Sequence, residues 1–138
     1  MIESRIMGID YGEKRIGIAL SDPLLTFAYP FTTLLNDSDF MKNISDIFKE
    51  KNVIKIILGL PSHKFKSSLE LSKKVEQLKN EIQMNFNIEV ILWDEEFSSV
   101  IAREKILESV TKKSKRKSKE LLDKHSAAII LQEFLDSK

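Results

Sequence analysis

Apolar residues form two short opening runs, followed by segments that alternate between strand and helix patterns. The opening runs predict strands over residues 4–11 and 14–20, joined by a glycine-containing turn that is typical of a β-hairpin. A third strand is expected near 27–34. Val53 to Leu60 is a continuous apolar run that ends before a proline, and Ile88 to Trp93 is expected to form a fifth strand.

Segments whose apolar residues have helical spacing lie between the later strands. Asp37-Ser38-Asp39 opens the first predicted helix. A second helix precedes Ile88, a third begins at Ser98-Ser99 and reaches about Glu108, and the last ends near Asp136. The lysine-rich residues 112–119 are expected to be a loop or the start of that last helix. The apolar positions that define the first two helices are Phe40, Ile44, Ile47 and Phe48, then Leu71, Val75, Leu78, Ile82 and Phe86.

This order predicts an α/β fold with a mixed five-stranded sheet and helices on both faces. The hairpin strands should be antiparallel, and the later strands, which alternate with helices, should be parallel and buried. The length of 138 residues fits a single domain over 1–138.

Composition narrows the function classes. The chain has no cysteine, which excludes disulfides, thiolate zinc sites and cysteine nucleophiles. The opening residues lack the apolar core of a signal peptide, and no run is long enough to span a bilayer. We therefore expect a cytoplasmic protein with no membrane partner, as a monomer or a homodimer.

The net charge of +1 hides an uneven distribution. The tract Lys112–Lys119 carries six positive charges and no negative one, so the rest of the chain has a net charge of −5. Such a tract is either a solvated segment or a site that grips phosphates, and the clustering favours a polyanionic partner. The predicted nucleic-acid contacts are Lys112, Lys113, Lys115, Arg116, Lys117 and Lys119, with Lys14 and Arg15 of the hairpin.

Acidic residues fall where functional sites of open α/β sheets usually lie, at carboxyl ends of strands and at helix starts. Asp10 ends the first strand, Asp94 and Glu95 end the last strand, and Asp123 is expected to begin the last helix. Each also has a plain structural interpretation. Asp10 can bond amides of the turn, Asp94 and Glu95 can mark a strand exit, and Asp123 can cap the helix.

The position of Asp123 on the predicted helix favours a functional interpretation of this residue. It precedes Ala127 by four residues and Ile130 by seven, so it lies on the apolar stripe that packs against the sheet. Carboxylates converging from two strand ends and a helix suit hard cations such as Mg²⁺ or Mn²⁺. Two such ions about 4 Å apart promote phosphodiester hydrolysis. Asp10, Asp94, Glu95 and Asp123 are therefore the predicted catalytic and metal-binding residues.

Four motifs, in order, resemble those of the YqgF family, also called RuvX-type Holliday-junction resolvases or pre-16S rRNA nucleases. The first is Gly8-Ile9-Asp10-Tyr11-Gly12 and the second is Ile57-Leu58-Gly59-Leu60-Pro61. The third is Trp93-Asp94-Glu95 with Ser98-Ser99, and the last is Lys115-Arg116-Lys117 followed by Asp123-Lys124 and Ala127-Ala128. The resemblance covers essentially the whole chain, with two departures. Glu96 stands where the family usually has Arg, and Ser62-His63-Lys64-Phe65-Lys66-Ser67 stands where the family usually has a glycine-containing loop.

The resemblance implies an RNase H-like fold, metal-dependent nuclease chemistry and a role in maturing the 5′ end of 16S ribosomal RNA. It also implies that Asp10, the Asp94-Glu95 pair and Asp123 form the acidic site, with the metal ligand of that pair left open. Structured RNA is the expected substrate, with branched DNA, as for a Holliday-junction resolvase, as an alternative. Glu96 gives weight to a non-catalytic RNA-binding ribosome-assembly factor as a second interpretation. An actin-like nucleotide-binding fragment is a third.

Overall fold

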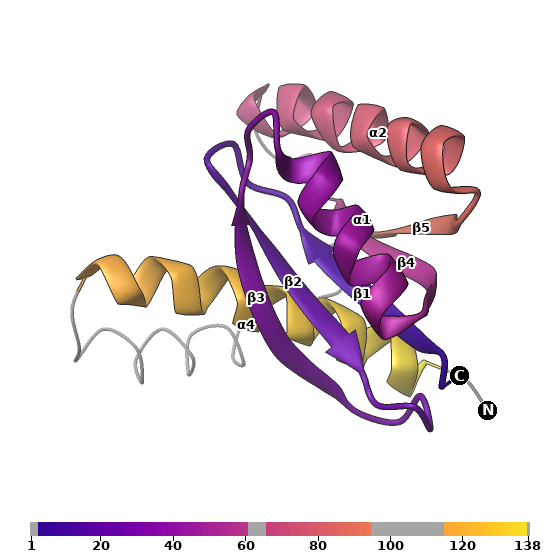
Figure 1. Ribbon diagram of the computed structural model, residues 1–138. Coiled ribbons are helices and arrows are strands. Elements are labelled where there is room, and N and C mark those ends of the chain that lie inside the picture. Colours follow the sequence, from indigo (N-terminus) through magenta and orange to yellow (C-terminus); the bar gives the residue numbers. More distant parts are fainter. Residues whose placement is uncertain (1–2, 61–65, 95–114, 138) are drawn as a thin grey trace.

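The structure, a computed structural model, describes residues 3–60, 66–94 and 115–137, with side chains from residue 69 in α2 and from residue 124 in α4. Figure 1 shows the arrangement of the elements. They are, in chain order, β1 (Arg5–Asp10), β2 (Arg15–Ser21), β3 (Ala28–Leu35), α1 (Phe40–Lys51), β4 (Val53–Leu60), α2 (Lys66–Phe86), β5 (Glu89–Asp94) and α4 (Lys115–Asp136).

The five strands form one mixed sheet in the order β3-β2-β1-β4-β5. β1 pairs antiparallel with β2, and β2 with β3, whereas β4 is parallel to both β1 and β5. The predicted mixed sheet is therefore confirmed. The predicted helix from Ser98 to Glu108 lies outside the described residues.

Helices cover both faces of the sheet, as predicted. One face packs against α1 and α2 through a core that includes Met7, Ile9 and Leu58. The other face packs against α4 through a second core that includes Ile6, Ala19 and Ile57. Figure 1 shows α1 and α2 on one side of the strands and α4 on the other. Alternate residues of each central strand thus point to different cores, as the strand period requires.

The start of α4 corrects one sequence-based expectation. Asp123 was expected to begin this helix, but α4 begins at Lys115, so Asp123 lies in the third turn. An N-cap role for Asp123 is therefore wrong, since capping and the helix dipole act within the first turn. The later half of the basic tract, from Lys115 to Lys119, belongs to the helix, while Lys112 and Lys113 lie outside the described residues.

Close contact between α4 and β1 depends on Gly8. A Cβ atom at Gly8 would lie 2.7 Å from the carbonyl oxygen of Ala127 and 2.8 Å from the Cβ of Leu131. Both distances are shorter than van der Waals contact. The missing side chain therefore allows the α4 backbone to approach the centre of the sheet.

Gly8→Ala is expected to lower the free energy of unfolding by about 1–3 kcal/mol, because α4 must shift to admit the methyl group. Chemical denaturation of the two proteins measures the difference. Ile6→Val on the same face is the control, and its expected cost is about 0.5–1.5 kcal/mol without any shift of α4. A Gly8→Ala protein as stable as the wild type would contradict the tight packing at this point.

Candidate functional site

Asp10 is the last residue of β1, and its side chain is half-buried. Met7 and Ile9 belong to the α1–α2 core, whereas Gly8 meets α4. Strand alternation therefore places Asp10 on the α4 face, at the carboxyl edge of the sheet. Open α/β sheets bind ligands at this edge.

Glycines flank Asp10 on both neighbouring strands. On β2 its Cα partner is Gly17. On β4 the next residue after the Ile9–Leu58 pair is Gly59. Neither glycine has a side chain beside the carboxylate on the α4 face. The positions directly beside Asp10 on the two neighbouring strands therefore place no side chain between its carboxylate and a phosphate or a cation. Glycine inside a strand often marks close approach of a ligand, and this signal was present in the sequence at both positions.

The turn after Asp10 is held by close backbone contacts. A Cβ atom on Gly12 would lie 2.2 Å from the carbonyl oxygen of Arg15, so only glycine fits there. The side-chain amide of Asn36 donates a hydrogen bond to the carbonyl oxygen of Gly12 at 2.9 Å. The backbone amide of Asn36 donates to the carbonyl oxygen of Lys14, also at 2.9 Å. These bonds fix the turn to the end of β3 and so fix the position of Asp10.

Both hairpin cations lie close to Asp10 in the fold. Lys14 is exposed, and Arg15 is half-buried at the start of β2. Arg15 and Gly17 are two residues apart and therefore share the α4 face, which is also the face of Asp10. Their predicted contact with nucleic acid stays a prediction.

Asp94 lies on the opposite face. Its Cα partner is Leu60, which packs against the α1–α2 core, while the preceding Trp93 packs against α4. The indole nitrogen of Trp93 donates a hydrogen bond to Glu133 of α4 at 3.2 Å. β4 separates β1 from β5, which places their axes about 10 Å apart. The structure therefore does not bring Asp94 and Asp10 together on one face.

The backbone of Asp123 lies one helical turn before Ala127, which packs over Gly8. Asp123 precedes Ala127 by about 6 Å along α4, and Asp10 follows Gly8 by about 6.6 Å along β1. Asp10 follows Gly8 by two residues, whereas the C-terminal part of α4 packs near the beginning of β3, where Gln132 binds the amide of Ala28. The Asp123 backbone thus lies toward the carboxyl end of β1, as Asp10 does. Glu95 and the side chain of Asp123 lie outside the described part of the chain.

The predicted donors are all carboxylates, which fit Mg²⁺ or Mn²⁺ better than softer metals. The half-buried Asp10 with its glycine neighbours is compatible with such an ion. Among the described residues, no group of three or more His, Asp or Glu side chains is close enough to hold a metal. Asp10 is therefore the one predicted ligand whose place on the α4 face is described at the side-chain level. Within the same ranges, no helix is long and apolar enough to cross a membrane.

The overall shape is similar to that of known resolvases. A Thermus thermophilus RuvC in complex with a Holliday junction substrate aligns with a TM-score of 0.57 and 8% identity, covering 97% of this chain and 94% of the other. The fowlpox virus resolvase bound to Holliday junction DNA aligns with a TM-score of 0.54 and 14% identity, over 96% of this chain and 97% of the other. At these identities the likeness concerns the fold alone, and it confirms the RNase H-like fold.

Proteins related in sequence are similar to this chain over nearly its whole length. A protein of Sulfurihydrogenibium sp. named "Putative pre-16S rRNA nuclease" is 40% identical over 137 residues, covering 96% of this chain and 90% of the relative. A protein of the same name from Bacteroides thetaiotaomicron is 39% identical, covering 98% of both chains. The family profile described as "RuvX: Holliday junction resolvase" matches residues 4–137. On these two grounds, profile and relatives, the chain belongs to the RuvX family.

Proposed function

We propose that this protein is a divalent-metal-dependent nuclease that hydrolyses phosphodiester bonds in the precursor of 16S ribosomal RNA. The observation that carries the proposal is the placement of Asp10. This half-buried carboxylate lies at the carboxyl edge of the sheet, between two glycines and on the α4 face. The names of the relatives supply the substrate.

The proposed metal ligands are Asp10, Asp123 and one member of the Asp94-Glu95 pair. Because Asp94 lies on the face opposite Asp10, we favour Glu95 as the ligand from this pair. When bound, Mg²⁺ or Mn²⁺ would lower the pKa of a coordinated water and offset charge on the leaving oxygen. The carboxylates would supply the negative charge that holds the ions. Arg15, on the same face, would bind a phosphate of the substrate.

The basic tract would position the nucleic-acid backbone beside this site. Lys115, Arg116, Lys117 and Lys119 fall in the first five residues of α4. Lys119 precedes Asp123 by four residues, or about 6 Å along the helix. The N-terminal end of a helix also carries partial positive charge. A phosphate bound by this part of α4 would lie within one or two helical turns of Asp123.

The direct test is cleavage of a 16S rRNA precursor by purified protein with Mg²⁺ or Mn²⁺. We expect cleavage that stops when the metal is chelated. A four-way DNA junction assayed in parallel tests the alternative substrate, which the family description favours. Cleavage of the junction but not of the RNA would replace the proposed substrate, and metal-dependent cleavage of neither would contradict the proposal.

Replacing the four α4 cations with Ala is expected to weaken RNA binding and to flatten its dependence on salt. Each lost phosphate contact lowers the slope of log Kd against log salt by about 0.7 for single strands. Affinity measured at several salt concentrations gives the slope. The control removes four lysines of α1 and α2, namely Lys42, Lys49, Lys73 and Lys79. An equal loss of slope in both variants would show that general charge, not the α4 cluster, holds the RNA.

A further inference from the structure

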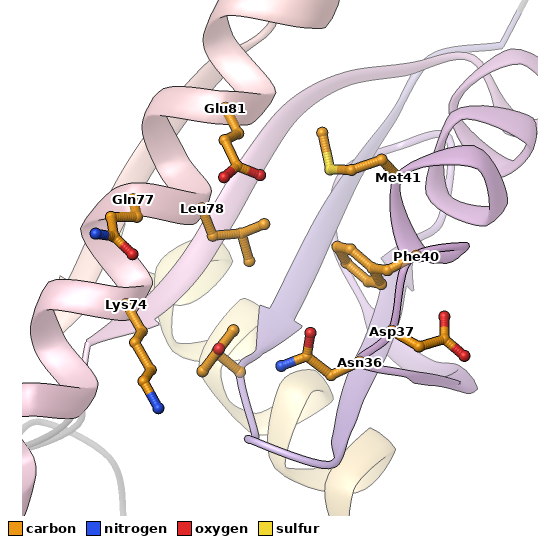
Figure 2. Close-up of a pocket in the computed structure, with 9 residues that line it drawn as sticks. Asn36, Asp37, Phe40, Met41, Lys74, Gln77, Leu78 and Glu81 are labelled. Carbon is orange, nitrogen blue, oxygen red and sulfur yellow. The ribbon is translucent and has the colours of Figure 1, made fainter.

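A pocket of about 320 Å³ opens next to Asp10, on the opposite face of the sheet. Its lining includes Tyr11, the residue that follows Asp10, together with residues of α2 and of the segment that leads into α1. In Figure 2, Phe40 and Leu78 face the space between the two helices. The volume lies within the range of small-molecule sites, about 300–1,000 Å³.

The floor of the pocket is apolar and partly aromatic. Phe40 and Leu78 are buried, with 3% and 7% of their surface exposed. Tyr11 and Met41 are half-buried and also line the space. The half-buried Tyr11 ring can stack on a planar apolar surface, while the buried Phe40 and Leu78 close the bottom of the pocket.

The rim of the pocket is polar and rich in hydrogen-bond acceptors. The side-chain nitrogen of Asn36 donates a hydrogen bond to the carbonyl oxygen of Gly12, and in Figure 2 the side-chain oxygen points toward Phe40, on the pocket side. The carboxylate of Glu81 and the amide of Gln77 also line the pocket, whereas the carboxylate of Asp37 accepts a hydrogen bond from the backbone amide of Asp39 at 2.9 Å and points away from α2 in Figure 2. Lys74, the cation of the rim, forms an ion pair with Glu13 at 3.7 Å. An anion would meet the Glu81 carboxylate, while the charge of Lys74 is already paired with Glu13, so a phosphate does not fit.

A neutral planar ring whose edge carries amino groups does fit these contacts. We propose that the pocket accepts an unpaired nucleobase with an exocyclic amino group. The inference rests on the proposed function, because it concerns the nucleic acid bound at Asp10. Proteins that recognise single strands stack bases on aromatic rings and bind their polar edges in this way.

The path from the proposed cleavage site to the pocket is short. Tyr11 and Asp10 are adjacent, with Cα atoms about 3.8 Å apart, and their side chains point to opposite faces of the sheet. A strand crossing the carboxyl edge of the sheet can therefore keep its phosphate near Asp10 and place a neighbouring base in the pocket. The pocket would then select which nucleotide lies next to the cleaved bond.

Cytidine and uridine hexaribonucleotides test the inference, because the two bases differ in the edge group that the rim would read. Cytosine carries an amino group where uracil carries a carbonyl oxygen. Affinities are measured by fluorescence anisotropy without divalent metal, so that no cleavage occurs. We expect cytidine hexamers to bind about five- to tenfold more tightly, which is within the range of one good base contact.

Two variants locate the preference in the pocket. Glu81→Ala removes an acceptor and should reduce the cytidine preference to below about twofold. Glu76→Ala, on the same helix but away from the pocket, removes the same charge and should leave the preference intact. Tyr11→Leu keeps an apolar floor and should weaken both hexamers by about fivefold or more through lost stacking.

Equal affinities in the wild type, or a preference unchanged by Glu81→Ala, would overturn the pocket inference. Failure to bind either hexamer would also overturn it. If the rRNA precursor is still cleaved in those cases, the proposed function stands. If neither hexamer binds and no nucleic acid is cleaved with metal present, both the pocket and the proposed function are wrong.

Discussion

Cleavage by the Asp10→Asn variant is expected to fall about a thousandfold or more, because a metal ligand of this kind supports several kcal/mol of transition-state stabilisation. The substitution keeps the size of the side chain and one oxygen atom but removes the negative charge. The glycines at positions 17 and 59 leave no side chain of the sheet beside it to take over. Single-turnover cleavage of the rRNA precursor in Mg²⁺ measures the loss.

The same variant should fold like the wild type. Asp10 lies at the end of β1 and is half-buried, so an amide of equal size leaves the two cores untouched. We expect the melting temperature to change by no more than about 2 °C. RNA binding without metal should be retained. Metal-dependent cleavage that survives in Asp10→Asn would refute the assignment, and RNA binding by a wild type that cleaves nothing would favour an assembly factor.

The pattern of apolar residues was sufficient to predict the sheet. The run from Val53 to Leu60 became β4 with the same bounds, because a strand buried between two helical layers needs apolar residues on both faces. The hairpin was predicted by its glycine-containing turn, and a Cβ atom on Gly12 of that turn would clash with the backbone of Arg15. These features are local, so a single sequence contains them.

The start of α4 could not be predicted in the same way. Its apolar stripe begins near Ala127, whereas the helix begins at Lys115. Lysine and arginine are good helix formers, so the first turns need no apolar face to be helical. The sequence therefore leaves residues 112–119 open as a loop or as the start of this helix, and the placement of Asp123 at the helix start was wrong.

The relation among the acidic residues depends on tertiary structure. The sequence places Asp94 and Glu95 next to each other at the end of a strand, but it does not show which face Asp94 occupies. The contact of Ala127 with Gly8 shows which residues of β1 face α4. The pairing of Leu60 with Asp94 shows that Asp94 faces the α1–α2 core. Neither contact is local in sequence. The pocket beside Tyr11 was missed for the same reason, since α1 and α2 meet there only in the fold.

Comparison of Glu95→Gln with Asp94→Asn should separate the two acids of the last motif. We expect Glu95→Gln to reduce metal-dependent cleavage about a hundredfold or more, and Asp94→Asn to reduce it less than about tenfold. The reason is the position of Asp94, which shares the α1–α2 face with Leu60 while Asp10 lies on the α4 face. Both substitutions remove one charge and keep the shape of the side chain.

Metal affinity provides the matching measurement. Titration of Mn²⁺ into each variant should show weaker binding for Glu95→Gln and near wild-type binding for Asp94→Asn, because only a ligand contributes directly to the affinity. Thermal unfolding of both proteins controls for loss of structure. The opposite ranking would mean that Asp94 reaches the ions despite the face on which it lies. Since β4 lies between β1 and β5, that result would require the metal site to extend over the carboxyl edge of the sheet rather than along its α4 face.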